Sequence, residues 1–250
     1  MRKWVRSDDH FCYMSVIPVA PSYWERASSL EQRTMLALLA YAAGDAYGFQ
    51  CEFIARIKPP APITIGTKLG WPAGDVSDDT LLTRLSILAL AAQTPMQAQA
   101  DFIGSLQSNV NKLRGLGPTT RSVLGLPVKE RELPQVGSSN GGMMRTAICG
   151  IAFSDPTLRR VWITALTEAT HSQTPARDCA LALAAAYGEF DRPIRSAILA
   201  QELDQRIRER IENLDSWIPP HDGISNDSLD TLSAVVQVVE SSKSVLDTRR

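Results

Sequence analysis

Apolar residues recur every three to four positions along most of the chain, which is the spacing of one face of an α-helix. The clearest example lies in residues 28–48. Ser28 and Glu31 have the spacing of a capping box, in which each side chain bonds the other residue's backbone N–H, so a helix is predicted to begin after Ser28. The apolar stripe of this helix consists of Leu36, Leu39, Ala40 and Ala43. Gly44 and Gly48 are predicted to end it.

Helices with the same period are predicted along the rest of the chain. Four of them begin at or next to a proline, which lacks an N–H and therefore loses no hydrogen bond in the first turn. The predicted helices are 79–92, one starting at Thr94-Pro95, 144–153, one starting at Asp155-Pro156, one from Thr174-Pro175 to Phe190, one from Pro193 to about Asn213, and 228–242. Residues 109–142 are rich in glycine and proline and form either a long functional loop or short helices joined by turns. No segment alternates as a strand does, so the sequence predicts an all-α fold in a single compact multi-helix domain.

The chain is predicted to divide into an N-terminal arm, residues 1–27, and a helical domain, residues 28–250. The arm has no clear helical period, yet it is rich in aromatic side chains, namely Trp4, Phe11, Tyr13, Tyr23 and Trp24. Disordered tails are usually poor in aromatic residues. The arm therefore either packs on its own domain or docks on a partner.

Charge and cysteine usage narrow the range of partners. The 250 residues carry 26 basic and 27 acidic side chains, a net charge of -1, whereas nucleic-acid binders usually have a basic excess. No apolar run reaches the ~18 residues that a membrane span needs. The four cysteines lie far apart without a CxxC pair and fit reduced core thiols. We expect a cytoplasmic protein that binds neither nucleic acid nor membrane.

Hydroxyl and carboxylate groups gather at the predicted start of the helix 79–92. Ser77 or Asp78 can cap this helix, and acidic groups are favourable at its positive end. Alternatively, Ser77, Asp78 and Asp79 form part of a divalent-cation site, because Mg²⁺ binds hard oxygen ligands, often one or two carboxylates with waters. This set is incomplete, so further ligands have to come from elsewhere.

Three other segments carry candidate chemistry. Residues 44–53 place a carboxylate, Glu52, among glycines and apolar residues where a helix breaks. Residues 137–145 form a glycine-rich segment that opens a helix, where backbone N–H groups can bind phosphate, although the segment is no P-loop. His171 lies between two predicted helices and is either a hydrogen-bonded packing residue or part of a site.

Taken in order, these four segments resemble the motifs of the ADP-ribosylglycohydrolase family. Residues 44–52 resemble the family pattern GDALGxxxE, and residues 77–80 resemble TDDT with serine for the first threonine. Residues 139–145 resemble GNGxxMR with serine for the first glycine, and residues 170–171 match TH. The resemblance covers about residues 30–245.

The resemblance implies a hydrolase that removes ADP-ribose from modified protein, typically from arginine, with two Mg²⁺ ions. Ser77, Asp78 and Asp79 would be the metal ligands of one Mg²⁺ and would share the second. The catalytic residues would be Glu52, Asp78 and Asp79. The substrate-binding residues would be Glu52, Asn140, Gly141, Gly142, Met143, Met144 and His171, with backbone N–H groups of residues 140–144 on the diphosphate. Arg145 would pair with a carboxylate of the site or pack at the helix start.

One family motif, GGDTDT, has no counterpart in the sequence. In the family its aspartates and threonine complete the two-metal centre. Residues 222–236 resemble the loop and helix before that motif, and residues 227–231 have similar side chains but align with the start of that helix. We therefore expect either a piece of a longer protein or a natural family member with an impaired metal centre.

Two principal functions follow from these residues. The first is a Mg²⁺-dependent hydrolase that cleaves the N-glycosidic bond of ADP-ribosylated protein and reverses mono-ADP-ribosylation. The second is a catalytically impaired relative that binds ADP-ribose or acts as an immunity protein against an ADP-ribosyltransferase toxin through its N-terminal arm. A plain helical interaction domain would leave the four ordered motifs unexplained. The motifs favour the enzyme.

Overall fold

The structure, a computed structural model, describes residues 21–49, 72 and 74–242. Within these ranges it consists of helices and turns, with no strand and one isolated β-bridge between Ser139 and Asp227, which confirms the predicted all-α fold. The α-helices are α1 (Pro21–Arg26), α2 (Ser29–Gly48), α3 (Asp78–Ala89), α4 (Pro95–Ser108), α5 (Pro118–Val123), α6 (Gly141–Thr146), α7 (Pro156–Glu168), α8 (Thr174–Gly188), α9 (Ile194–Leu199), α10 (Gln205–Glu212) and α11 (Ser228–Ser241). The 3-10 helices are η2 (Val110–Lys112), η3 (Glu130–Gln135), η4 (Ala147–Ala152) and η5 (Leu214–Ser216). Of the helices so described, none has the length and apolar character needed to cross a membrane.

The helix starts predicted at Ser28, Thr94 and Asp155 are confirmed, and each has a side-chain cap. Ser28 and Glu31 form the reciprocal capping box at the start of α2. The hydroxyl of Thr94 accepts a hydrogen bond from the N–H of Gln97, and Asp155 accepts from the first turn of α7. Each cap satisfies N–H groups that have no partner within the helix, so these boundaries follow from local chemistry.

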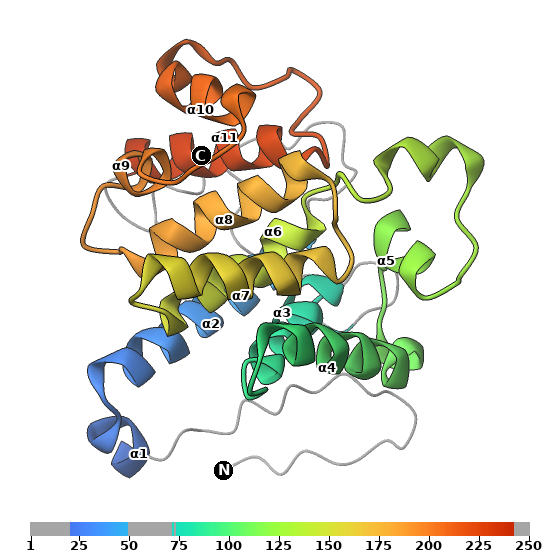
Figure 1. The fold of residues 1–250 in the computed structure, drawn as a ribbon, viewed down its shortest axis with the longest axis vertical. Coiled ribbons are helices and arrows are strands. Elements are labelled where there is room, and N and C mark those ends of the chain that lie inside the picture. The colour runs from blue at the N-terminus through green and yellow to red at the C-terminus, as the bar shows by residue number, and fades with distance from the viewer. Residues whose placement is uncertain (1–20, 50–71, 73, 243–250) are drawn as a thin grey trace.

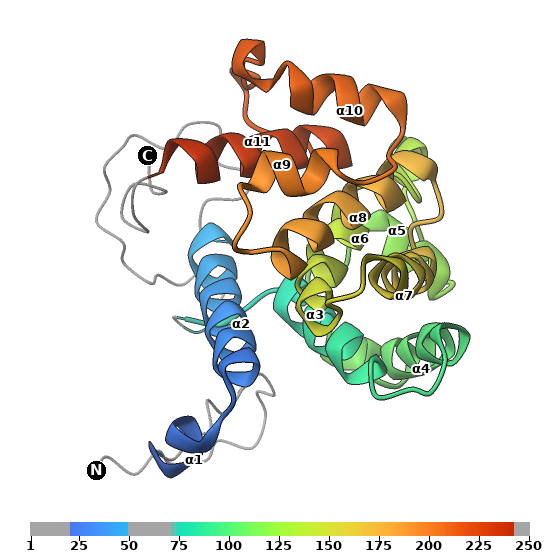
Figure 2. The ribbon, with the colours of Figure 1, turned by 60° about the vertical axis from the view of Figure 1, so that its left-hand side comes forward.

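Helix α8 forms the centre of the core. Figures 1 and 2 show it crossing the molecule among α6, α7, α9 and α11, and all four contact it, as does η4. Its fully buried residues are small, namely Ala176, Cys179, Ala180, Ala182, Ala184 and Ala185. Small side chains allow the surrounding helices to approach closely, which explains why an alanine-rich sequence lies at the most buried position.

The helix predicted over residues 193–213 is wrong as a single element, because the chain breaks there into α9 and α10. Asp204 caps α10, and its own N–H donates to the carboxylate of the buried Asp178 at 2.8 Å. Arg208 donates to the carbonyls of Leu199 and Gln201. These tertiary hydrogen bonds hold the backbone groups that a continuous helix would have paired internally.

Two other predicted segments differ in detail. The helix expected over 144–153 begins earlier, at Gly141, and becomes the 3-10 helix η4 from Ala147. The glycine- and proline-rich stretch 109–142 contains the short helices η2, α5 and η3 rather than one long loop. The second of the two alternatives for this stretch is therefore the one observed.

The apolar stripe of α2 lies on the outside of the molecule. Leu36 is 55% exposed and Leu39 is 48% exposed, while Ala46 is the residue of this helix that is buried. In Figure 2, α2 stands at one side of the helical body. The core therefore lies around α8, and α2 contributes to it through its C-terminal end.

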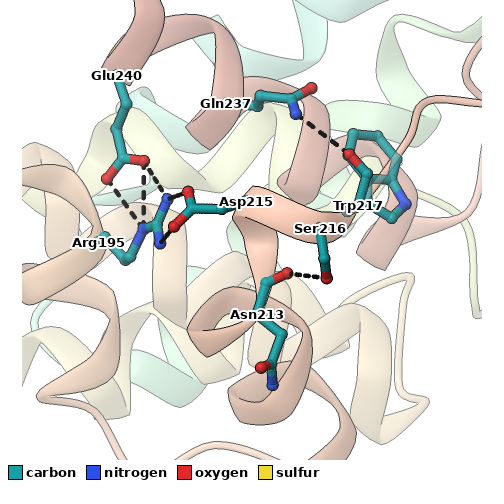
Figure 3. Close-up of polar contacts among 7 residues, drawn as sticks. All are labelled: Arg195, Asn213, Asp215, Ser216, Trp217, Gln237 and Glu240. Carbon is teal, nitrogen blue, oxygen red and sulfur yellow. Dashed lines mark hydrogen bonds and ion pairs between the residues drawn. The ribbon is translucent and has the colours of Figure 1, made fainter.

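A cluster of charged side chains fastens the C-terminal helices together (Figure 3). Arg195 on α9 donates to Asp215 in η5 at 2.7 Å and to Glu240 on α11 at 2.6 Å. On the same side, the amide of Gln237 donates to the carbonyl of Trp217 at 3.3 Å. These contacts tie α11 to the segment that follows α10, and the start of α11 in turn contacts the candidate site.

Candidate functional site

The motif at residues 44–52 and the motif at residues 77–80 are the first and second along the chain. Hydrogen bonds join them at the N-terminus of α3. The carboxylate of Asp45 on α2 accepts from the backbone N–H of Ser77 at 3.0 Å and from that of Thr80 at 3.1 Å. It also accepts from the hydroxyl of Thr80 at 2.6 Å. One carboxylate oxygen thus satisfies N–H groups that the helix start leaves free and holds α3 at a fixed position on α2.

The three predicted metal ligands lie at this helix start but face different neighbours. The hydroxyl of Ser77 accepts from the N–H of Asp79 at 3.1 Å, so Ser77 is the cap of α3, as one of the two interpretations of the sequence held. A carboxylate oxygen of Asp78 lies so close to Gly115 that a Cβ there would be 2.9 Å away. Asp79 lines a separate hollow between α2 and α3. Nearby, Asp75 forms an ion pair with Arg114.

The hollow has a volume of about 400 Å³. Its lining residues are Tyr41, Gly44, Asp45, Gly48, Phe49 and Asp79. Burial raises the pKa of Tyr41 well above its usual range, and the carboxylate of Asp79 raises it further, so the phenol keeps its proton. A carboxylate beside a neutral phenol can accept a hydrogen bond or bind a cation. The hollow is the place where the first two motifs meet.

The donor set fits a hard divalent cation only in part. Asp78 and Asp79 supply carboxylate oxygens in consecutive positions, which is the chemistry that Mg²⁺ prefers. Among the residues that the structure describes, no group of three or more histidine, cysteine or acidic side chains is arranged to hold a metal ion. Glu52, the predicted catalytic and substrate-binding carboxylate, lies outside the described residues. The described part of the site therefore contains two consecutive carboxylates that face different neighbours, so a shared cation would need further ligands and a common orientation of the two.

The third motif, residues 139–145, is hydrogen-bonded to the start of α11 and to the residues just before it. The hydroxyl of Ser228 donates to the carbonyls of Ser138 and Ser139, each at 2.9 Å. The N–H of Asn140 donates to the carbonyl of Asn226 at 2.8 Å, and its side-chain amide donates to Thr231 at 3.1 Å. The segment that resembles the loop and helix before the family's GGDTDT motif is thus hydrogen-bonded to the glycine-rich loop, a contact that the sequence did not reveal.

The predicted substrate-binding residues of this loop have unequal access to solvent. Met143 is buried in the core, and Met144 is partly buried against it. Gly141 and Gly142 lie against the ring of His171, where a Cβ on Gly142 would be 2.9 Å from the Cβ of His171. The close approach of the histidine therefore leaves no room for a Cβ at Gly142 and only a tight fit for one at Gly141.

His171 is only 2% exposed and has a hydrogen-bond partner on each ring nitrogen. Its Nδ1 lies 2.8 Å from the hydroxyl of Thr170, and its Nε2 lies 3.0 Å from the hydroxyl of Ser139. Burial, and after it the charge of Arg145, lowers the pKa of His171 to about 3, so the ring is neutral at physiological pH. A direct stacking contact of this ring with a substrate would require the glycine-rich loop to move.

Arg145 is the centre of the packing beneath the loop. It is 1% exposed, and its guanidinium lies over the ring of Phe102, 4.1 Å from the ring centroid. It donates to the hydroxyl of Ser86 on α3 at 3.1 Å and to the hydroxyl of Thr170 at 2.7 Å. Of the two roles that the sequence left open for Arg145, the described contacts match packing rather than pairing with a carboxylate.

The four motifs therefore form two hydrogen-bonded pairs with a common support. Asp45 joins the first motif to the second, Ser139 joins the third to the fourth, and Arg145 reaches from the third to α3 and to Thr170. Sequence reasoning assigned no role to Tyr41 or Ser86. Both lie within helices of ordinary apolar pattern, and neither carries a local signal that would have singled it out.

Comparison with known proteins agrees with this arrangement. A solved structure titled "ADP-ribosylglycohydrolase-related protein complex" has the same helical fold, with a TM-score of 0.65 and 21% sequence identity over 87% of this chain and 78% of that chain. The sequence profile of the ADP-ribosylglycohydrolase family matches residues 26–249. This chain therefore belongs to the ADP-ribosylglycohydrolase family, as the resemblance of its motifs indicated. A search of curated protein sequences finds no match.

Proposed function

We propose that this protein is a Mg²⁺-dependent hydrolase that cleaves the N-glycosidic bond between ADP-ribose and an arginine side chain of a modified protein. The observation that carries the proposal is the pairing of four motifs that are far apart in the sequence. Asp45 bonds the start of α3, and Ser139 bonds His171, so the candidate metal ligands and the candidate loop each have a fixed support. Membership of the ADP-ribosylglycohydrolase family supports the reaction class.

The metal-binding role falls to the start of α3. Asp78 and Asp79 are the residues that would hold Mg²⁺, with Ser77 as a third oxygen ligand if its hydroxyl can bind metal while capping the helix. When bound, Mg²⁺ polarises water and orients substrate oxygens. Asp45 keeps this helix start in place by accepting three hydrogen bonds from it. Loss of Asp45 would therefore displace both carboxylates without removing either.

The remaining residues would bind and orient the substrate. Cleavage of an N-glycosidic bond develops positive charge on the ribose, which nearby carboxylates stabilise. Asp79 lines the hollow beside α2 and is the described carboxylate best placed for this role, with Glu52 as its predicted companion. The loop around Asn140 would contact the diphosphate, with His171 supporting the loop from inside.

The alternative proposal is a family member that binds ADP-ribose or a toxin without turnover. It depends on an N-terminal arm most of which, residues 1–20, lies outside the described residues. It differs from the enzyme in one measurable respect, because no N-glycosidic bond would be cleaved.

The decisive experiment measures release of labelled ADP-ribose from an arginine-modified protein, with and without Mg²⁺. We expect release with Mg²⁺, and a loss of at least about a hundredfold in D78N and D79N if each carboxylate holds the metal. Asp101, exposed on α4, supplies a matched control, and D101N should match the wild type. ADP-ribose binding without release in excess Mg²⁺ would favour a relative that binds ADP-ribose, and absence of both binding and release would contradict the enzyme.

A further inference from the structure

The buried Arg145 carries a charge that its described surroundings do not neutralise. Its hydrogen-bond partners within the described residues are the hydroxyls of Ser86 and Thr170 and the carbonyls of Leu166 and Thr167, and none is a carboxylate. Removing a guanidinium from water is costly unless its charge is compensated. The electrostatic potential around this group therefore favours an anion at any nearby position that a ligand can reach.

The hydrogen bonds around Arg145 have a direction that the chemistry fixes. A guanidinium only donates, so Thr170 receives its hydrogen bond at 2.7 Å. The positive charge turns the hydroxyl proton of Thr170 away from Arg145, toward Nδ1 of His171 at 2.8 Å. A neutral imidazole carries one proton, and when Nδ1 accepts, that proton is on Nε2. Nε2 then donates to the hydroxyl oxygen of Ser139 at 3.0 Å.

The last hydroxyl of this series has its own proton left to donate. The hydroxyl of Thr119 lies 3.4 Å away, which is long for an O–H···O hydrogen bond. Thr119 itself lies 3.2 Å from the carbonyl of Gln135 and accepts from the N–H of Gly137 at 3.0 Å. Ser139 is partly exposed, whereas Arg145, Thr170 and His171 are buried, so Ser139 is where the network reaches the surface.

We propose that Arg145, Thr170 and His171 are positioning residues that hold the Ser139 hydroxyl as a hydrogen-bond donor to a phosphate oxygen of the substrate. The proposal rests on the proposed function, because it takes ADP-ribose as the ligand. Each member of the network polarises the next in the same sense, from the buried cation to the exposed hydroxyl. A phosphate oxygen at Ser139 would also place a negative charge at the exposed end of the network that begins at the buried guanidinium.

The test is the affinity for ADP-ribose, measured by calorimetry, with adenosine as a ligand that lacks the phosphates. S139G removes the hydroxyl, and we expect ADP-ribose to bind about ten- to a hundredfold more weakly, with no change for adenosine, because a hydrogen bond to a charged group is lost. S139T keeps a hydroxyl and should retain most of the affinity. Thermal unfolding of each variant checks that the fold is intact.

The network is tested by Thr170→Val, which keeps the shape of the side chain and removes its hydroxyl. If Thr170 acts through Ser139, T170V should weaken ADP-ribose binding, and the double variant T170V/S139G should bind no more weakly than S139G alone. Additive losses would overturn the positioning role, since a purely structural effect of T170V would add to that of S139G. Wild-type affinity in S139G would overturn the inference and leave the proposed function intact. Failure of the wild type to bind ADP-ribose would contradict the proposed function itself.

Discussion

Asp45 shows how a side chain on one helix can fix the position of candidate site residues on another. It belongs to α2, yet its three hydrogen bonds are all with the first residues of α3. Like an ordinary N-cap, the Asp45 carboxylate accepts hydrogen bonds from N–H groups at the helix start. Because it belongs to a neighbouring helix, it also fixes the distance between α2 and α3. The candidate metal ligands Asp78 and Asp79 lie within this turn, so their placement depends on Asp45.

Asp45 and Thr80 are therefore expected to be energetically coupled. D45N and T80V should each lower the free energy of unfolding, and a double-mutant cycle in denaturant should give a coupling energy of about 0.5–3 kcal/mol. Asp155 caps α7 within its own sequence and serves as the control. D155A should cost about 1 kcal/mol, as caps commonly do, and should be additive with T80V. A coupling energy near zero for Asp45 and Thr80 would show that the hydrogen bonds between α2 and α3 do not form in solution.

His171 makes the stability of the protein depend on pH in a predictable sense. Its pKa is lowered by burial and by Arg145 to about 3, against about 6.5 in an unfolded chain. Between these values the unfolded state binds the extra proton, so the free energy of unfolding rises with pH and the contribution is lost as pH falls below about 6.5. The slope from this one group should reach about 1.4 kcal/mol per pH unit.

H171Q removes the titrating ring and should flatten this dependence between about pH 4 and 6.5, where the slope of the wild type is measured by denaturation at successive pH values. Carboxylates contribute equally to both proteins, so the difference between the two curves isolates His171. The ¹⁵N shifts of the wild-type ring provide a second measurement and should show a single Nε2–H tautomer across this range. Parallel stability curves, or a ring that protonates near pH 6, would contradict the burial of a neutral histidine.

At the scale of elements, η4 and α8 approach each other so closely that their contact leaves no room for a side chain at Gly150. A Cβ on Gly150 would lie 2.1 Å from the carbonyl oxygen of Ala184, a distance that no side chain tolerates. Gly188, at the end of α8, similarly leaves space for the guanidinium of Arg159, which pairs with Glu189 at 2.6 Å. These glycines are required by packing, although both have ordinary backbone angles.

Gly150→Ala is expected to lower the free energy of unfolding by about 1–3 kcal/mol or more, because the backbone of α8 has to move to admit the methyl group. Gly104 in α4 is the matched control, since a Cβ there meets nothing within 4 Å. G104A should leave the stability unchanged or raise it by up to about 1 kcal/mol, the helix-propensity difference between glycine and alanine. Chemical denaturation of both variants checks the prediction, and equal effects would mean that η4 and α8 are farther apart in solution.

Local signals in the sequence predicted where the helices begin, but they did not predict tertiary hydrogen bonds. Caps such as Thr94 and Asp155 act over two or three residues, which is why those boundaries are confirmed. The break between α9 and α10 depends on Asp178, which is 26 residues from Asp204 in the sequence. In the same way, the motifs identified the candidate residues, whereas the burial of His171 and the support of the loop by Ser228 needed the fold.

At the scale of the whole molecule, the buried side chains lie mainly on the helices around α8, so the core is on one side of α2. The apolar stripe that looked like a core face in the sequence is exposed, while Leu106 of α4 and Leu166 of α7 are fully buried. Periodicity alone identifies an apolar face and says nothing of what it contacts. The family match extends across α2, so this helix belongs to the domain even though most of its side chains are partly or fully exposed.

Two leucine substitutions test this placement of the core. Leu106 on α4 is 0% exposed, and L106A should lower the free energy of unfolding by about 2–5 kcal/mol, because the deleted atoms lose their contacts and leave a cavity. Leu36 on α2 is 55% exposed, and L36A should change the free energy by no more than about 0.5 kcal/mol. Because both changes remove the same atoms from a helix, the difference between them reports burial rather than helix propensity. A cost of several kcal/mol for L36A would mean that the outer face of α2 is covered in solution, and the boundary of the core would then have to be drawn beyond this helix.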